Sequence, residues 1–403
     1  MVNQVTQSGY ISRLFVVAKI LFLLVALASL IYAVVTAPFE GKDLAYFQDI
    51  GRAWTAGIYQ TGEGVFYGQP PFTAVLFSPL AVLSFEQWRV IFIGLNLVAA
   101  GLILFFVKQL WGATWPAKAH LYLGAYLFSI APFRVTVRYG QISLIVTALM
   151  LGALVARTRN KKVLAGVLVG LSLCKYPLTL PFFLYFALRK ECKIVAAAIL
   201  IVAVLTEVFA VRLGLSLVAV TRDYIEAILH TSPVNDPLFA GRTELGPLLF
   251  HLTERNEELA GAINFALVVG GMLSMVIVFR RRPQCERLHL AAIAFFSLWY
   301  VYHRTYDSVL CILPAAVFVD FLVRKVFPRL AIFSLAVLSL FIISVPGLLA
   351  DRLHLEVERL ADPAGVLALN LERLLVFGMF CWLLVFLWRT APGHCGEAKD
   401  STA

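Results

Sequence analysis

Apolar runs of about 15 to 25 residues recur along the whole chain, and they constrain its fold more than any other feature. The first, "LFVVAKILFLLVALASLIYAVV", is longer than the apolar core of a secretory signal and predicts a membrane span. Of the 403 residues, 61% are hydrophobic and 14% are charged, whereas a soluble domain carries about 25% charged residues. We therefore predict an all-α integral membrane protein, a multispanning helical bundle.

Basic clusters give the predicted topology. The formal net charge is +10, but basic residues in short membrane loops mark the cytoplasmic side, so membrane lipids are expected partners and nucleic acid is not. We place four clusters in the cytoplasm: "RTRNKK" (157–162), "LRKECK" (188–193), "RRRPQCER" (280–287) and "VRKVFPR" (323–329).

The apolar stretch between the first two clusters is too short for two full spans, yet both of its ends are basic. It is interpreted as two short helices that run up and back and join at "CKYP". Pro177 favours the break, because the residue before a proline is pushed out of helical geometry. Lys175 is then predicted at the tip of this hairpin, in or near the outer half of the bilayer.

Each crossing moves the chain from one side of the membrane to the other. Counting crossings outward from the cytoplasmic clusters along residues 1–403 predicts a single transmembrane domain of about twelve crossing helices, with both termini in the cytoplasm. Residues 37–87 form the first external loop, whose apolar "PPFTAVLFSPLAVLSF" is interpreted as a short juxtamembrane helix. Residues 215–258 form a second, long external loop. Several crossing elements are shorter than the roughly 20 residues of a full span.

The unusual charged and polar residues collect on the outer side in this topology. Carboxylates and cations on one face suit a reaction between an anionic ligand and a hydroxyl. Ionisable groups in or at the edge of a membrane are functional candidates by default, because charge in such surroundings is costly. The candidates are Asp43, Asp49, Arg134, Arg138, Gln141, Lys175, His303, Arg304 and Asp307.

Five segments, in this order, resemble glycosyltransferase family 87 of the GT-C superfamily: "KDLAYFQDIGRAWTAGIY", "FYGQPPFTAVLFSPLAVL", "RYGQISLIVTALMLGAL", "GVLVGLSLCKYPLTLPFFL" and "YHRTYDSVLCILP". Each segment alone is unspecific, and their order and spacing carry the resemblance, which covers about residues 40–325. Gln69 stands where the family often has Tyr, and Ser143 stands where Asn is common. These departures bear on the identity of the sugar or the acceptor.

The resemblance implies a GT-C-type bundle and an inverting transfer of a sugar, at the outer face of the plasma membrane. The donor is a polyprenyl-phosphate sugar, and the acceptor is a glycolipid, a polysaccharide or a protein. Asp43 matches the family's first-loop acid and is the predicted base, and His303 is the second predicted catalytic residue. The predicted contacts to the donor phosphate or substrate are Lys175, Arg304, Arg138, Gln141, Asp49 and Tyr67. No cofactor is expected, and no metal is predicted because the outer face has no HxxxH or DxD cluster.

Each candidate also has a structural interpretation. Asp43 and Asp307 could cap helices, Asp49 could be solvated or paired with Arg52, and Lys175 could extend toward the membrane surface. His303 could be an ordinary interfacial residue, and Arg304 could pair with Asp307. Arg138 and Gln141 could shape a loop, while Trp54 and Tyr67 could pack at the interface.

Two other classes of function remain open at this point. A secondary transporter could have the same number of spans, although it would tend to show repeated halves, and these are not evident. A structural membrane partner would not need acids and cations gathered on one side. For the transferase, the resemblance implies mannose as the first choice of sugar and arabinofuranose as the second.

Overall fold

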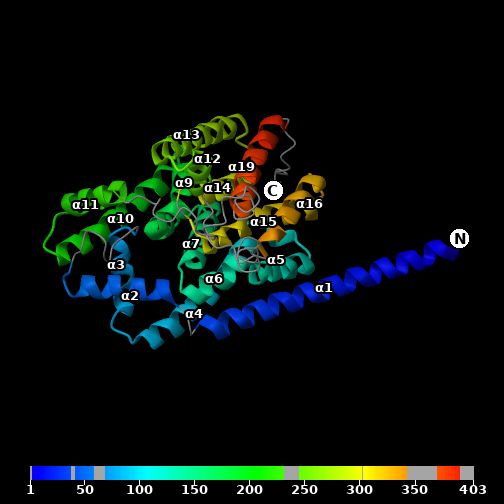
Figure 1. Ribbon diagram of the computed structural model, residues 1–403, viewed down its shortest axis with the longest axis horizontal. Helices are drawn as coiled ribbons and strands as arrows, with labels where there is room; N and C mark the ends of the chain where they lie inside the picture. Colours follow the sequence, from blue (N-terminus) through cyan, green and yellow to red (C-terminus); the bar gives the residue numbers. More distant parts are fainter. Residues whose placement is uncertain are drawn as a thin grey trace.

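Helices make up every regular element in the computed structural model, which describes residues 2–37, 41–58, 69–230, 245–301, 303–342 and 370–390. The N-terminal part of the long first helix extends away from the other helices (Figure 1). The elements are α1 (Val2–Thr36), α2 (Lys42–Thr55), α3 (Phe72–Phe77), η2 (Ser78–Leu80), α4 (Phe85–Leu110), η3 (Gly112–Thr114), α5 (Ala117–Ser129), α6 (Ala131–Tyr139), α7 (Ser143–Thr158), α8 (Lys162–Ser172), η4 (Leu173–Lys175), α9 (Tyr176–Leu188), α10 (Cys192–Arg212), α11 (Leu217–His230), α12 (Gly246–Leu252), α13 (Glu257–Arg281), α14 (Glu286–Trp299), η6 (Thr305–Cys311), α15 (Ile312–Val323), α16 (Pro328–Ser339), η7 (Leu340–Ile342) and α19 (Leu371–Arg389).

Seven helices in the described residues are long and apolar enough to cross a membrane, or up to eight if the bent pair α6 and α7 counts as one span. The chain is thus a multispanning helical membrane protein, as predicted. The predicted number of about twelve crossing helices is larger for two reasons. Helices α5, α14 and α16 have only 13, 14 and 12 residues, and the run Lys162–Leu188 counts once.

The run Lys162–Leu188 nevertheless folds back on itself. A straight helix of 27 residues would be about 40 Å long. Yet Lys162 Nζ, at its start, lies 2.9 Å from the Glu191 carboxylate just after its end. Helices α8 and α9 therefore form a hairpin with η4 at its tip, which confirms the interpretation of "CKYP".

The four basic clusters meet on one face of the bundle, which we call the basic face. Arg157 at the end of α7 pairs with Glu191 at 3.0 Å and also with Glu286 at the start of α14. Asp320 of α15 is fully buried and pairs with Arg287 and Arg324. Burial opposes ionisation of Glu191, but hydrogen bonds from Lys162 and Arg157 hold the pKa of its carboxyl below the usual value.

Helix α14 runs through the interior from the basic face toward the opposite face. Every residue from Leu288 to Trp299 is buried, and the following span Thr305–Val323 is also mostly enclosed by protein. The link between them, which contains "HRTYD", is thereby held inside the bundle.

The opposite face carries the predicted juxtamembrane helices. Helix α2 is amphipathic, with Leu44, Phe47 and Ile50 buried and Asp49 exposed. The indole Nε1 of Trp54, near the end of α2, donates to the carbonyl of Phe209 at 3.2 Å, which fixes α2 against the end of α10. Helices α2, α3, α10 and α11 lie together at one end of the molecule (Figure 1).

Candidate functional site

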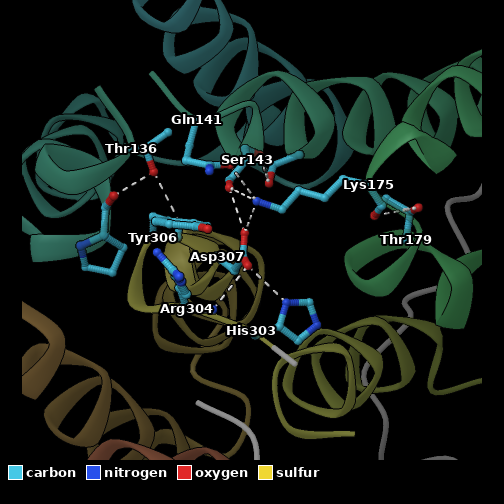
Figure 2. Close-up of polar contacts among 11 residues, drawn as sticks. Thr136, Gln141, Ser143, Lys175, Thr179, His303, Arg304, Tyr306 and Asp307 are labelled. Atoms are coloured by element: carbon cyan, nitrogen blue, oxygen red, sulfur yellow. Dashed lines mark hydrogen bonds and ion pairs between the residues drawn. The ribbon is translucent and has the colours of Figure 1, made fainter. Parts of the chain in front are cut away.

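Three segments far apart in the chain meet around the carboxylate of Asp307 (Figure 2). The turn between α6 and α7 contributes Gln141 and Ser143, the hairpin tip contributes Lys175, and the link after α14 contributes His303. We call these five residues the Asp307 cluster. Their exposed fractions are 3% for Asp307, 6% for Lys175, 6% for Gln141, 1% for His303 and 0% for Ser143.

The carboxylate has separate partners for its two oxygens. Asp307 Oδ1 lies 2.5 Å from Lys175 Nζ and accepts a hydrogen bond from Ser143 Oγ at 2.7 Å. Asp307 Oδ2 lies 3.0 Å from His303 Nδ1 and accepts from the Arg304 backbone N–H at 3.4 Å. A buried charge is tolerated only when it is paired and hydrogen-bonded, and both charges of this ion pair meet that condition.

Lys175 is held at the hairpin tip by the local backbone. Its φ of −122° and ψ of 63° lie outside the helical region, so the break falls at Lys175 itself. Pro177 follows in the first turn of α9, where its missing N–H leaves no hydrogen bond unmade. The ammonium donates to Gln141 Oε1 at 3.1 Å and to Ser143 Oγ at 2.8 Å, and lies 4.5 Å from the centre of the Tyr306 ring.

The turn that carries Gln141 and Ser143 is sharply bent. Helices α6 and α7 meet at 114°, and Gly140 ends α6 with a left-handed φ of 70°. A Cβ on Gly140 would lie 2.6 Å from Leu44 Cβ of α2. Glycine is required here both by the backbone conformation and by the close approach of α2.

Asp43 lies beside this turn. Gly41 is the N-cap of α2, so Asp43 does not cap the helix, and its side chain is half-buried in the first turn. Asp43 Oδ2 is buried and accepts no hydrogen bond from the described residues. The neighbouring Leu44 lies against Gly140, the residue before Gln141 of the Asp307 cluster.

The other predicted site residues are more dispersed. Asp49 is exposed, and Arg52 donates to the carbonyls of Ala81 and Leu83 rather than pairing with it. The Arg138 guanidinium lies 5.2 Å from the centre of the Tyr32 ring of α1. Arg304 is half-buried beside Asp307, and Tyr67 lies outside the described residues.

Asp307 is among the charged candidates in the sequence, but neither it nor Ser143 is among the predicted catalytic or substrate-binding residues, and both lie at the centre of the cluster. The alternative role of Asp307 as a helix cap is partly met, because it accepts from the Arg304 N–H at the start of η6. The signal that could have identified it is its spacing of four residues from His303, which makes the imidazole–carboxylate contact.

An apolar groove of about 440 Å³ runs along α7 between α4 and α8. Ile142 and Cys174, which line one end, are chain neighbours of Gln141, Ser143 and Lys175. Gly152 and Phe106 line the other end. The ten helical steps from position 142 to position 152 rise about 15 Å, and the groove is lined almost entirely by aliphatic and aromatic side chains.

Metal ligation is not indicated in the ranges that the structure covers, where no group of three or more His, Cys, Asp or Glu side chains could hold an ion. What the cluster offers chemically is a buried cation with three oxygen partners, an imidazole bound to a carboxylate, and a nearby second carboxylate, Asp43. These groups can neutralise an anionic headgroup and move a proton.

The family model described as glycosyltransferase family 87 matches residues 67–301. The matched region includes Arg138, Gln141 and Lys175, whereas Asp43 and His303 lie outside it. No curated protein matches the chain.

Proposed function

The chain belongs to glycosyltransferase family 87, and on that premise we propose that this membrane glycosyltransferase takes its sugar from a polyprenyl-phosphate donor. The acceptor is the hydroxyl of a glycolipid or a polysaccharide. Family membership decides against a secondary transporter and a structural partner. Mannose is the proposed sugar, with arabinofuranose as the alternative.

The observation that carries this proposal is that Ile142 and Cys174, which line the apolar groove, are chain neighbours of residues in the Asp307 cluster. A lipid-linked sugar phosphate has an apolar tail and a charged headgroup only one bond apart. The groove supplies an apolar surface about 15 Å long, and Lys175, the residue after Cys174, supplies a cation. A water-soluble nucleotide sugar would make no use of the groove.

In the proposed reaction, an acceptor hydroxyl oxygen attacks the anomeric carbon while the bond from that carbon to the phosphate oxygen breaks. Asp43 takes the hydroxyl proton, which accelerates such a step by about 10² to 10⁴-fold. The polyprenyl phosphate leaves with the bonding electron pair, and the Lys175 cation stabilises its charge. His303 orients the phosphate or the acceptor. Attack opposite the leaving group inverts the anomeric configuration.

We propose that the basic face is cytoplasmic and that the Asp307 cluster opens to the extracytoplasmic side of the plasma membrane. Short loops rich in Lys and Arg remain on the cytoplasmic side. The ion pairs of Arg157, Lys162 and Arg287 place these loops on one face, away from the Asp307 cluster.

The test is transfer by the purified protein in lipid nanodiscs. Radiolabelled polyprenyl-phosphate mannose and polyprenyl-phosphate arabinofuranose are offered separately, with an envelope lipid and polysaccharide extract as acceptor. We expect one donor to label a product whose mass increases by one sugar residue. Labelling from a nucleotide sugar instead, with none from either lipid donor, would refute the proposed donor class.

A further inference from the structure

We propose that Asp307 is a positioning residue that fixes both the Lys175 ammonium and the His303 imidazole for sugar transfer. This role rests on the proposed function, because Lys175 and His303 act there on the donor and the acceptor. Asp307 itself does not touch substrate. It acts through the two side chains that it holds.

The first support is that one carboxylate joins three separate segments. Through Asp307, the hairpin tip, the bent turn and the link after α14 are held together inside the protein. The carboxylate already accepts from Lys175, Ser143, His303 and Arg304. Its lone pairs are therefore engaged, and it is poorly placed to take a proton from an acceptor hydroxyl.

The second support comes from the His303 ring. A carboxylate only accepts hydrogen bonds, so its contact with Nδ1 keeps the imidazole proton on that nitrogen. The other nitrogen, Nε2, lies on the side of the ring away from Asp307 (Figure 2). Asp307 thereby sets both the tautomer and the orientation of His303, as carboxylates do for imidazoles in other enzymes.

The third support comes from Lys175. An ammonium has three donors, and they are directed at Asp307, Ser143 and Gln141. Removing Lys175 from Asp307 would leave a buried carboxylate without its countercharge, which is costly. Gln141 is the most distant partner and is neutral, so a donor phosphate takes the place of Gln141 while Asp307 keeps the ammonium aimed at it.

Asp307→Asn tests the role with little change of shape. An amide has one acceptor oxygen and one NH₂ group, so it cannot accept from both Lys175 and His303. We expect kcat to fall by about 10² or more, which is typical when an acid–base group is misaligned. The donor KM should rise as well, because Lys175 keeps its charge but is no longer held in the orientation that meets the phosphate.

The double variant Asp307→Asn/His303→Ala separates positioning from general structural damage. If Asp307 acts through His303, adding Asp307→Asn to His303→Ala should reduce kcat much less than it does in the wild type. Multiplicative losses, or a raised donor KM at normal kcat, would overturn the proposal. Asp223→Asn, an acid of α11 outside the cluster, is the matched control and should behave as wild type.

Ser143→Ala provides an independent route if Asp307→Asn does not fold. It removes the hydrogen bond from Ser143 to the carboxylate and the one that Lys175 donates to Ser143. We expect about a tenfold lower kcat, and this loss should also shrink in the His303→Ala background. If Ser143→Ala and His303→Ala lower kcat independently of each other, the positioning role is wrong. A wild-type protein that transfers no sugar would refute the proposed function instead.

Discussion

At the scale of single residues, Lys175 uses all of its ammonium donors within the protein, so a phosphate has to replace one of its present partners. The ion pair with Asp307 and the hydrogen bonds to Ser143 and Gln141 hold the cation next in the chain to Cys174, which lines the apolar groove. The charge is thus held at one defined point, and in the proposed reaction it binds the donor phosphate while the groove binds the lipid tail.

Lys175→Ala is expected to weaken donor use far more than acceptor use, because it removes the cation that faces the phosphate. The donor KM should rise at least tenfold, and Lys175→Arg should restore part of the loss because it keeps the charge. Steady-state kinetics with each substrate varied separately measure this. Lys193→Ala, an exposed lysine near the basic face, is the matched control, and an unchanged donor KM in Lys175→Ala would remove the phosphate role.

Asp43→Asn is expected to lower turnover by about 10² or more, because the amide keeps size but cannot take a proton. Donor binding should survive, since Asp43 does not contact the Lys175 ammonium. Single-turnover transfer and donor binding are measured on the same preparation, with Asp223→Asn as control. A folded Asp43→Asn protein with near-normal turnover would end its assignment as base and make Asp49 the next carboxylate to test.

The sequence predicted Lys175, Gln141 and His303 as site residues, and the structure brings these three together. It could not identify Asp307 as their common partner, because a single sequence does not show which of several buried polar groups will pair. The local pattern at Asp307 fits a helix cap equally well, and the structure shows that the same carboxylate makes both kinds of contact.

At the scale of elements, the bent turn between α6 and α7 links α2 to the Asp307 cluster. Gly140 lets α2 approach so closely that Leu44 lies against the turn. The hairpin of α8 and α9 could be predicted, since its basic ends and Pro177 mark it in the sequence. The 114° bend could not, because it depends on the contact between α2 and a glycine about a hundred residues away in the chain.

Gly140→Ala is expected to displace α2 and with it Asp43. The added methyl group would meet Leu44, and a left-handed alanine costs about 1 to 2 kcal/mol. We expect turnover to fall by about 10², as small misplacements of catalytic groups do, together with a lower melting temperature. Gly94→Ala is the matched control, since nothing lies within 4 Å of its added Cβ. Unchanged turnover in Gly140→Ala would show that the position of α2 does not matter for the reaction.

At the scale of the whole molecule, the two faces carry different groups. One face holds the paired basic loops, and the other holds α2, the bent turn and the Asp307 cluster. The charge pattern predicted this division of the described residues into two faces. The number of full-length spans was not predictable by the same means, because a short helix such as α14 is enclosed by neighbours and need not match the bilayer on its own.

Thiol labelling in intact cells tests which face is outside. The background variant is Cys192→Ser, which removes the exposed native cysteine near the basic face. A single cysteine then replaces either Ser216, which follows α10, or Lys161, which precedes α8, and both positions are exposed. If α8, α9 and α10 each cross the membrane, three crossings separate these two positions, so they lie on opposite sides. We expect a membrane-impermeant maleimide to label Ser216→Cys in intact cells and Lys161→Cys only after lysis, because the Lys- and Arg-rich loop stays in the cytoplasm. The reverse pattern would place the Asp307 cluster on the cytoplasmic side, and labelling of both positions in intact cells would contradict the three crossings between them.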